Sequence, residues 1–183
     1  MDEIPCDFVR KCLSVVVADA TGSHSLVTKG ALDHVLAMCT RAGADAAPLD
    51  ARLHTAIEAR FEAWSEQGYR VLGVASRLVP ARSDAYTRDD EQGLNFDGFL
   101  LFMDPPKVDA GQTIRDLAQR GVQLKIITGD NHKVAQHVAT ALKLPVADLI
   151  TGSELNATRL ISELVKALAS ETARRYCLSG TGT

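Results

Sequence analysis

Aromatic residues are scarce in this 183-residue chain, at 5% of the sequence, so its core must be built mainly from aliphatic side chains. Long apolar runs are missing as well, since no stretch of 18 apolar residues occurs, which excludes a membrane-spanning helix within this sequence. The opening residues MDEIPCDF are acidic and lack the basic and apolar regions of a secretory signal. We therefore expect a soluble, cytoplasmic chain.

Neither sign of charge is in marked excess. Lys and Arg total 20 against 23 Asp and Glu, and the net charge of −3 gives no electrostatic reason to expect nucleic acid or an anionic membrane as a partner. With 46% apolar and 23% charged residues, the composition is that of a folded globular protein, which excludes disorder. The length suits one domain or two small ones.

The cysteines show no metal-binding or redox spacing. Cys6, Cys12, Cys39 and Cys177 form no CxxC pair and have no histidine pair beside them, so neither a zinc site nor a thioredoxin-like motif is indicated. The five histidines also show no pattern for metal binding or triad chemistry. We predict no metal site from the residues alone, and free thiols in a reducing cytosol.

Hydrophobic periodicity predicts a first module of the order β-β-α-α-β. Apolar and β-branched runs predict strands, and apolar residues three and four apart predict amphipathic helices. The predicted elements are a strand hairpin over 11–18 and 25–28, helices over 31–40 and 53–64, and a strand over 69–76 that follows a helix end at Gly68.

A polar stretch over 77–92 predicts an exposed loop, with a domain boundary near Asn95. Beyond it, strands and helices alternate, which predicts a parallel sheet with right-handed crossovers. The predicted strands are 97–104, 122–128 and 146–150; the predicted helices are 110–120, 134–142 and 155–176, with no further strand after the last. The expected fold class is α/β: a mixed β-α module over 1–94, a truncated parallel-sheet module over 95–176, and a tail over 177–183.

Thr128-Gly129-Asp130-Asn131 carries the strongest local signal for a site, because it joins the end of an apolar strand to the start of a helix. Ligands of parallel α/β sheets bind at the carboxyl ends of strands, and a helix N-terminus attracts phosphate. Thr128 can donate a hydroxyl, Gly129 permits close approach, and Asp130 or Asn131 can cap the helix. A capped turn without a ligand is the alternative.

Two weaker signals accompany it. Asp104 ends a strand and is followed by Pro105 and Pro106, which would hold its carboxylate on a stiff exit or hinge; an ordinary turn is the alternative. Three cations on the first module, Lys11, Lys29 beside Gly30, and Arg70, could bind a polyphosphate. Solvated surface charges are the alternative for each of them.

Five stretches in fixed order carry a family resemblance: IPCDFVRKCLSVVV, VTKGALDHVLAMC, GYRVLGVAS, FMDPPK and ITGDN. The chain resembles the cytoplasmic part of the P-type cation-transporting ATPases over roughly residues 2–160, and most of all their magnesium-transporting branch. The resemblance implies a nucleotide-binding domain inserted into a phosphorylation domain of the haloacid-dehalogenase type.

The resemblance also implies roles for individual residues, with ATP and Mg²⁺, as MgATP, for the cofactor. Lys11, Lys29 and Gly30 would lie in the ATP pocket, Arg70 would reach the phosphates, and Asp104 would contact the ribose or hinge. Thr128, Gly129 and Asp130 would line the phosphoryl site. Cys6 occupies the position of the family's adenine-stacking aromatic residue, with Phe8 two residues later as a further ATP-binding candidate.

Two family motifs are absent from this sequence: the phosphorylated Asp-Lys-Thr-Gly-Thr and the later Gly-Asp-Gly-x-Asn-Asp. The tail SGTGT lacks the aspartate. The resemblance therefore implies a catalytically incomplete part of an ATPase that couples ATP hydrolysis to the transport of a cation, Mg²⁺ for this branch, with the rest of the membrane enzyme as its partner. The alternatives are a free-standing nucleotide-binding or regulatory protein and, less favoured, a small dehalogenase-type phosphatase.

Overall fold

The computed structural model describes residues 2–6, 10–122, 124, 126–129, 131–144, 148–151 and 176–179. Contacts between residues divide the chain into two units, one of Met1–Glu62 with Val71–Phe102 and one of Ala63–Arg70 with Met103–Thr183. Helix α2 (Ala51–Glu66) and strand β6 (Arg70–Val79) contribute residues to both.

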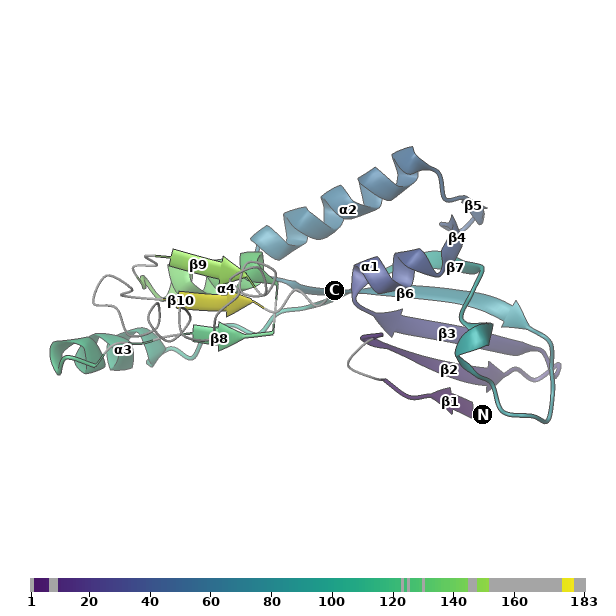
Figure 1. The fold of residues 1–183 in the computed structure, drawn as a ribbon, viewed down its shortest axis with the longest axis horizontal. Helices are drawn as coiled ribbons and strands as arrows, with labels where there is room; N and C mark the ends of the chain where they lie inside the picture. The colour runs from purple at the N-terminus through teal and green to yellow at the C-terminus, as the bar shows by residue number, and fades with distance from the viewer. Residues whose placement is uncertain are drawn as a thin grey trace, which may run out of the picture. The chain divides into compact units, whose positions relative to one another are not determined.

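The first unit contains a mixed seven-stranded sheet with the order β1-β2-β3-β6-β7-β4-β5 (Figure 1). Besides β6, its strands are β1 (Asp2–Ile4), β2 (Cys12–Ala18), β3 (His24–Gly30), β4 (Cys39–Ala42), β5 (Ala47–Pro48) and β7 (Leu94–Phe102). The pairs β1–β2, β2–β3, β3–β6 and β4–β5 are antiparallel, and the pair β4–β7 is parallel. The predicted mixed α/β architecture of this module is confirmed.

Helix α1 (Leu32–Ala37) covers one face of this sheet (Figure 1). It buries Leu32, Val35 and Leu36 against the core. Gly73 of β6 lies beneath the helix, where an added Cβ would stand 3.3 Å from the Cβ of Val35. The small residue lets helix and sheet approach closely, so their apolar surfaces leave water, which is worth roughly 25 cal/mol per Å².

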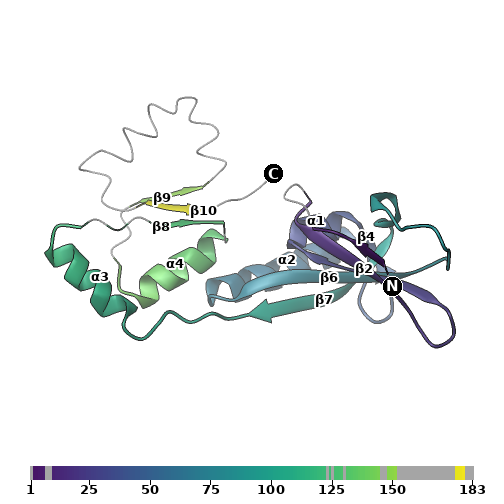
Figure 2. The same ribbon diagram turned by 90° about the horizontal axis from the view of Figure 1, so that it is seen from below.

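The second unit contains a three-stranded sheet with the order β8-β10-β9, and both of its pairings are parallel. Its strands are β8 (Ile126–Thr128), β9 (Asp148–Thr151) and β10 (Tyr176–Ser179), and its helices are α3 (Ala110–Gln119) and α4 (His132–Ala141). Helix α4 follows β8 and precedes β9 in the sequence, as the predicted β-α-β order requires. In space it lies beside the three-stranded sheet (Figure 2). The expected strand over 146–150 is seen from 148, and the expected helix over 155–176 lies mostly outside the described residues.

Most predicted elements of the first module are present with small shifts in their ends. The strands over 11–18, 25–28 and 69–76 correspond to β2, β3 and β6, and the helix over 53–64 is the centre of α2. The helix predicted over 31–40 ends at Ala37, because Cys39 begins β4. Strands β4 and β5 were not predicted, since with four and two residues they are too short to show an alternating pattern.

Two predictions of strand membership are wrong. The strand expected over 97–104 to open the parallel sheet is β7, which lies between β6 and β4 in the first unit and crosses the boundary expected near Asn95. An apolar run looks the same in either sheet, because its partners are distant in sequence. The expected tail over 177–183 contains β10, the central strand of the second sheet, although four residues between polar neighbours gave no strand signal.

Candidate functional site

Lys11 and Gly30 lie against each other where β2 begins and β3 ends. Gly30 is buried and pairs with Cys12 in the antiparallel ladder. A Cβ added to Gly30 would stand 2.4 Å from the carbonyl oxygen of Lys11 and 2.5 Å from the sulfur of Cys12. The same carbonyl accepts a hydrogen bond from the backbone N–H of Ala31 at 3.2 Å, so the two strand ends are tied together.

Lys29 directly precedes Gly30 at this contact, and its side chain is exposed. It pairs with Leu13 of β2 and with Val74 of β6, and therefore lies on the sheet face opposite the inward-pointing Thr28 and Gly30. Lys11 has a left-handed backbone with φ of 51°, a conformation that non-glycine residues adopt only when their surroundings impose it. The predicted Lys11, Lys29 and Gly30 are thus brought together at one end of the β2–β3 hairpin.

A buried polar chain runs beneath this end of the sheet. Glu91, 2% exposed, forms an ion pair with Arg10 through one carboxylate oxygen and accepts a hydrogen bond from the Ser14 hydroxyl at 2.5 Å through the other. Ser14 lies 2.7 Å from the Thr28 hydroxyl, its partner in the ladder. Because the single Ser14 hydrogen goes to the carboxylate, Thr28 must donate to Ser14.

Arg10 links these buried polar side chains to the backbone of Pro5 and Cys12. Its second amino group donates to the Pro5 carbonyl at 2.6 Å and to the Cys12 carbonyl at 3.4 Å. Arg10 therefore joins Pro5, after β1, to Cys12, the first residue of β2. Sequence reasoning missed Arg10, Glu91, Ser14 and Thr28; the one available signal was a hydroxyl residue at an inward position in each of two apolar strands.

Other predicted residues of the ATP site lie elsewhere or outside the described part. Phe8 lies outside the described residues, and Cys6 is exposed. Arg70 is the exposed first residue of β6, and Asp104 is exposed after the end of β7; both are assigned to the second unit. The predicted set is therefore divided between the two units, with Lys11, Lys29 and Gly30 in the first.

The strand–helix junction predicted at residues 128–131 is present in the second unit. Thr128 ends β8, paired with Ser179 of β10, and Gly129 forms a bend with open space around its Cα. Asn131 caps α4 by accepting a hydrogen bond from the Lys133 N–H at 2.9 Å, as the sequence predicted for residue 130 or 131. Asp130 lies outside the described residues.

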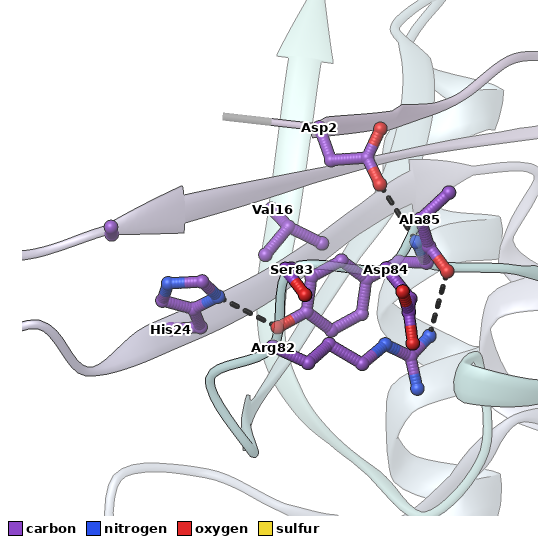
Figure 3. Close-up of a pocket in the computed structure, with 9 residues that line it drawn as sticks. Asp2, Val16, His24, Arg82, Ser83, Asp84 and Ala85 are labelled. Atoms are coloured by element: carbon purple, nitrogen blue, oxygen red, sulfur yellow. Dashed lines mark hydrogen bonds between the residues drawn. The ribbon is translucent and has the colours of Figure 1, made fainter.

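A pocket of about 320 Å³ opens at the opposite end of the β2–β3 hairpin, lined by Asp2, Val16, His24 and the segment 82–86 among others (Figure 3). The Tyr86 hydroxyl donates to the Pro80 carbonyl at 2.7 Å and therefore accepts from Nδ1 of His24, also at 2.7 Å.

Charged groups in and around this pocket pair with one another. The Arg82 guanidinium stacks 4.3 Å from the Tyr86 ring centroid and donates to Asp90 at 2.5 Å. The Tyr86 N–H donates to the Asp2 carboxylate at 2.7 Å, which holds the pKa of Asp2 below its ordinary value. These contacts fasten the segment after β6 to the edge of the sheet.

The described residues contain neither a metal-binding cluster nor a membrane-spanning helix. No group of three or more His, Cys, Asp or Glu side chains is placed to hold a metal ion. In the same part of the chain, no helix is both long and apolar enough to cross a bilayer.

A family model described as "P-type ATPase, cytoplasmic domain N" matches residues 1–109, which include Lys11, Lys29 and Gly30. The chain belongs to the P-type ATPase family. The match agrees with the resemblance carried by the sequence motifs and confirms the expected cytoplasmic placement of this domain.

Individual relatives carry the names of magnesium-transporting and calcium-transporting ATPases. The chain is 38% identical over 174 residues to the "Magnesium-transporting ATPase, P-type 1" of Salmonella typhimurium, covering 94% of this chain and 19% of that protein. It is 38% identical over 157 residues to the protein of the same name from Escherichia coli K12, with 85% and 18% covered. A "Calcium-transporting ATPase" of Bacillus subtilis is 28% identical over 146 residues, with 79% and 16% covered. The chain thus spans about a fifth of the length of these relatives.

Proposed function

We propose that the first unit binds the nucleotide of a P-type ATPase at the Lys11–Lys29–Gly30 end of the β2–β3 hairpin, with ATP, as MgATP, for the ligand. The observation that carries this is the close backbone contact between Gly30 and Lys11. The glycine holds the start of β2 against the end of β3, and this keeps Lys11 and Lys29 at one end of the hairpin, where two cations can neutralise a polyphosphate.

The residues present suit a nucleotide. Lys29 is exposed on an open sheet face whose neighbours Leu13, Val27 and Val74 are apolar and only partly buried. An apolar platform beside a cation suits a ligand with a flat base at one end and phosphates at the other. Mg²⁺ would arrive with the phosphates, since it is held mainly by phosphate oxygens and water rather than by a protein cage.

The second unit is proposed to hold the phosphoryl-site residues, with a haloacid-dehalogenase-like fold. Its support is the parallel sheet, the bend at Thr128–Gly129 and the capped start of α4, where unpaired N–H groups favour an anion. Arg70 and Asp104 are proposed nucleotide contacts, and Asp130 a phosphoryl-site residue. In the whole enzyme, with its membrane and actuator parts as partners, this chemistry would drive cation transport, with Mg²⁺ as the transported ion.

Titration calorimetry with MgATP tests the nucleotide site. Wild-type protein is expected to bind, and Lys29→Ala to weaken binding several-fold, because one phosphate-neutralising cation is lost. Lys143→Ala, which removes an exposed lysine after α4, is the matched control and should leave the affinity unchanged. Equal affinities for wild type, Lys29→Ala and Lys143→Ala would show that the site is misplaced.

A further inference from the structure

We propose that Glu91 is a positioning residue for the nucleotide site, acting on Lys11 through Arg10. The inference rests on the proposed function and adds to it a residue 80 positions from Lys11 in the sequence. Glu91 itself lies in the connection between β6 and β7, and its carboxylate binds Arg10 and Ser14 rather than a predicted nucleotide residue.

The first step is that Glu91 holds Arg10 in one place. The Glu91 side chain is 3% exposed and that of Arg10 is 17% exposed, so the pair is largely shielded from water. Both carboxylate oxygens are used, one by Arg10 and the other by Ser14. A buried carboxylate with both oxygens paired fixes its partner far more firmly than an exposed ion pair would.

The second step is that Arg10 joins two points of the backbone. Its guanidinium reaches the carbonyls of Pro5 and Cys12, so a single side chain ties the segment after β1 to the start of β2. A planar guanidinium can do this because its several N–H groups point in fixed directions. Lys11 follows Arg10 directly and keeps its left-handed backbone while its carbonyl is bound by Ala31.

The third step concerns Glu91 itself. The one-turn helix η1 (Arg88–Asp90) precedes it and is closed by a capping box between Thr87 and Asp90. The Glu91 N–H donates to the Arg88 carbonyl at 3.1 Å. The backbone of Glu91 is therefore held by η1, independently of its contact with Arg10.

The decisive variant is Glu91→Gln, which keeps size and one acceptor but removes the charge. By Coulomb's law alone, removing a negative charge should strengthen binding of the polyanion ATP. The positioning role predicts the opposite. MgATP affinity should fall about tenfold, because the side chains of Arg10 and Lys11 would then have to be ordered on binding. Trypsin should also cut faster after Arg10 under native conditions, as mapped by mass spectrometry, because the guanidinium is released.

Ile57→Val is the matched control, because it removes one methyl group from the core of the same unit, away from the polar chain. It should lower the unfolding midpoint while leaving both the MgATP affinity and cleavage after Arg10 unchanged. If Glu91→Gln does not fold, Arg10→Lys replaces it: a lysine keeps the charge but cannot serve Glu91, Pro5 and Cys12 together, and should weaken MgATP binding in the same direction.

The outcomes separate the two proposals. Wild-type affinity in folded Glu91→Gln, or in Arg10→Lys if that variant replaces it, with weakened binding in Lys29→Ala, would overturn the positioning role and leave the nucleotide site standing. No MgATP binding by wild-type protein would overturn the proposed function, and the positioning role with it.

Discussion

The carbonyl oxygen of Lys11 stands 2.4 Å from the point where a Cβ atom on Gly30 would lie. Real Cβ atoms do not approach a carbonyl oxygen so closely, so position 30 accepts no side chain without movement of β2 or β3. Two strand ends in contact through their main chains are thereby kept within reach of the exposed Lys29.

Gly30→Ala should destabilise the first unit by roughly 1–3 kcal/mol, the usual cost of forcing an extra carbon into packed structure. The added methyl meets backbone atoms of Lys11 and Cys12, which cannot turn aside as a flexible side chain can. Urea unfolding followed by circular dichroism measures the change. Gly129→Ala is the control, because nothing lies within 4 Å of its added Cβ. Equal losses of stability in the two variants would contradict the close backbone contact between Gly30 and Lys11.

Cys6→Phe should tighten MgATP binding by up to about tenfold, because an aromatic ring at the exposed position 6 can stack on adenine. The measurement is the same calorimetric titration. Cys6→Ser should bind as wild type does, since it adds no ring. A Phe variant that binds no tighter than the Ser variant would show that position 6 is not the adenine platform.

Alkylation should distinguish the cysteines by burial. Loss of solvation raises the pKa of Cys12 to about 11 and that of Cys39 to about 12, so at pH 8 almost no reactive thiolate forms at either. Cys6 is exposed and should react with iodoacetamide first, as read by peptide mass spectrometry. Unfolding in urea should make all three react at similar rates. Native labelling of Cys12 as fast as Cys6 is the contrary result.

Asp2→Asn should destabilise the protein at neutral pH and lose its effect in acid. The Tyr86 N–H, and then the Glu3 N–H, hold the pKa of Asp2 below its ordinary value of 3.8. A depressed folded-state pKa stabilises the fold above the ordinary value, and this stability is lost as pH falls through the lower one. Urea titrations at pH 7 and pH 3 measure it.

The control for this pH effect is Asp84→Asn, which changes an exposed carboxylate in the segment lining the same pocket. Its effect on unfolding should be small at both pH values. A wild-type to Asp2→Asn difference as large at pH 3 as at pH 7 would rule out the carboxylate as its source.

The chain should form no acyl-phosphate from ATP, because the attacking carboxylate of the Asp-Lys-Thr-Gly-Thr motif is absent from the sequence. Asp104 is an unsuitable substitute, since Pro105 and Pro106 offer no N–H groups to a phosphoryl group. Incubation with γ-labelled ATP and Mg²⁺, followed by acid quench, tests this. Hydroxylamine-sensitive label on an aspartate of this chain would instead favour a dehalogenase-type hydrolase.

The long periodic elements were predictable because their signals are local. Sixteen residues of α2 repeat apolar positions at helical spacing, and Gly68 with φ of 87° follows its end. Strand β2 alternates buried and half-buried residues over its first six positions. Strand β7 was also visible as an apolar run, but its partners β6 and β4 were not, because sheet neighbours are chosen by distant contacts.

The site was predicted in part for the same reason. Lys29 and Gly30 are adjacent in the sequence, and Lys11 was connected to them through the family motifs. Glu91 was hidden in a polar stretch expected to be an exposed loop, yet it is 2% exposed. Its burial depends on Arg10, which is 81 residues away, and no local pattern encodes such a pairing.

The parallel pairing of β4 with β7 has a consequence for synthesis on the ribosome. Cys39 of β4 is matched with Leu94 of β7, so β4 waits for more than fifty further residues before this sheet neighbour exists. Pairings of high sequence separation form slowly, and an unpaired strand edge is prone to aggregation meanwhile. The β1–β2–β3 meander can form early from local contacts, whereas the far side of the sheet must assemble late, when β7 leaves the exit tunnel.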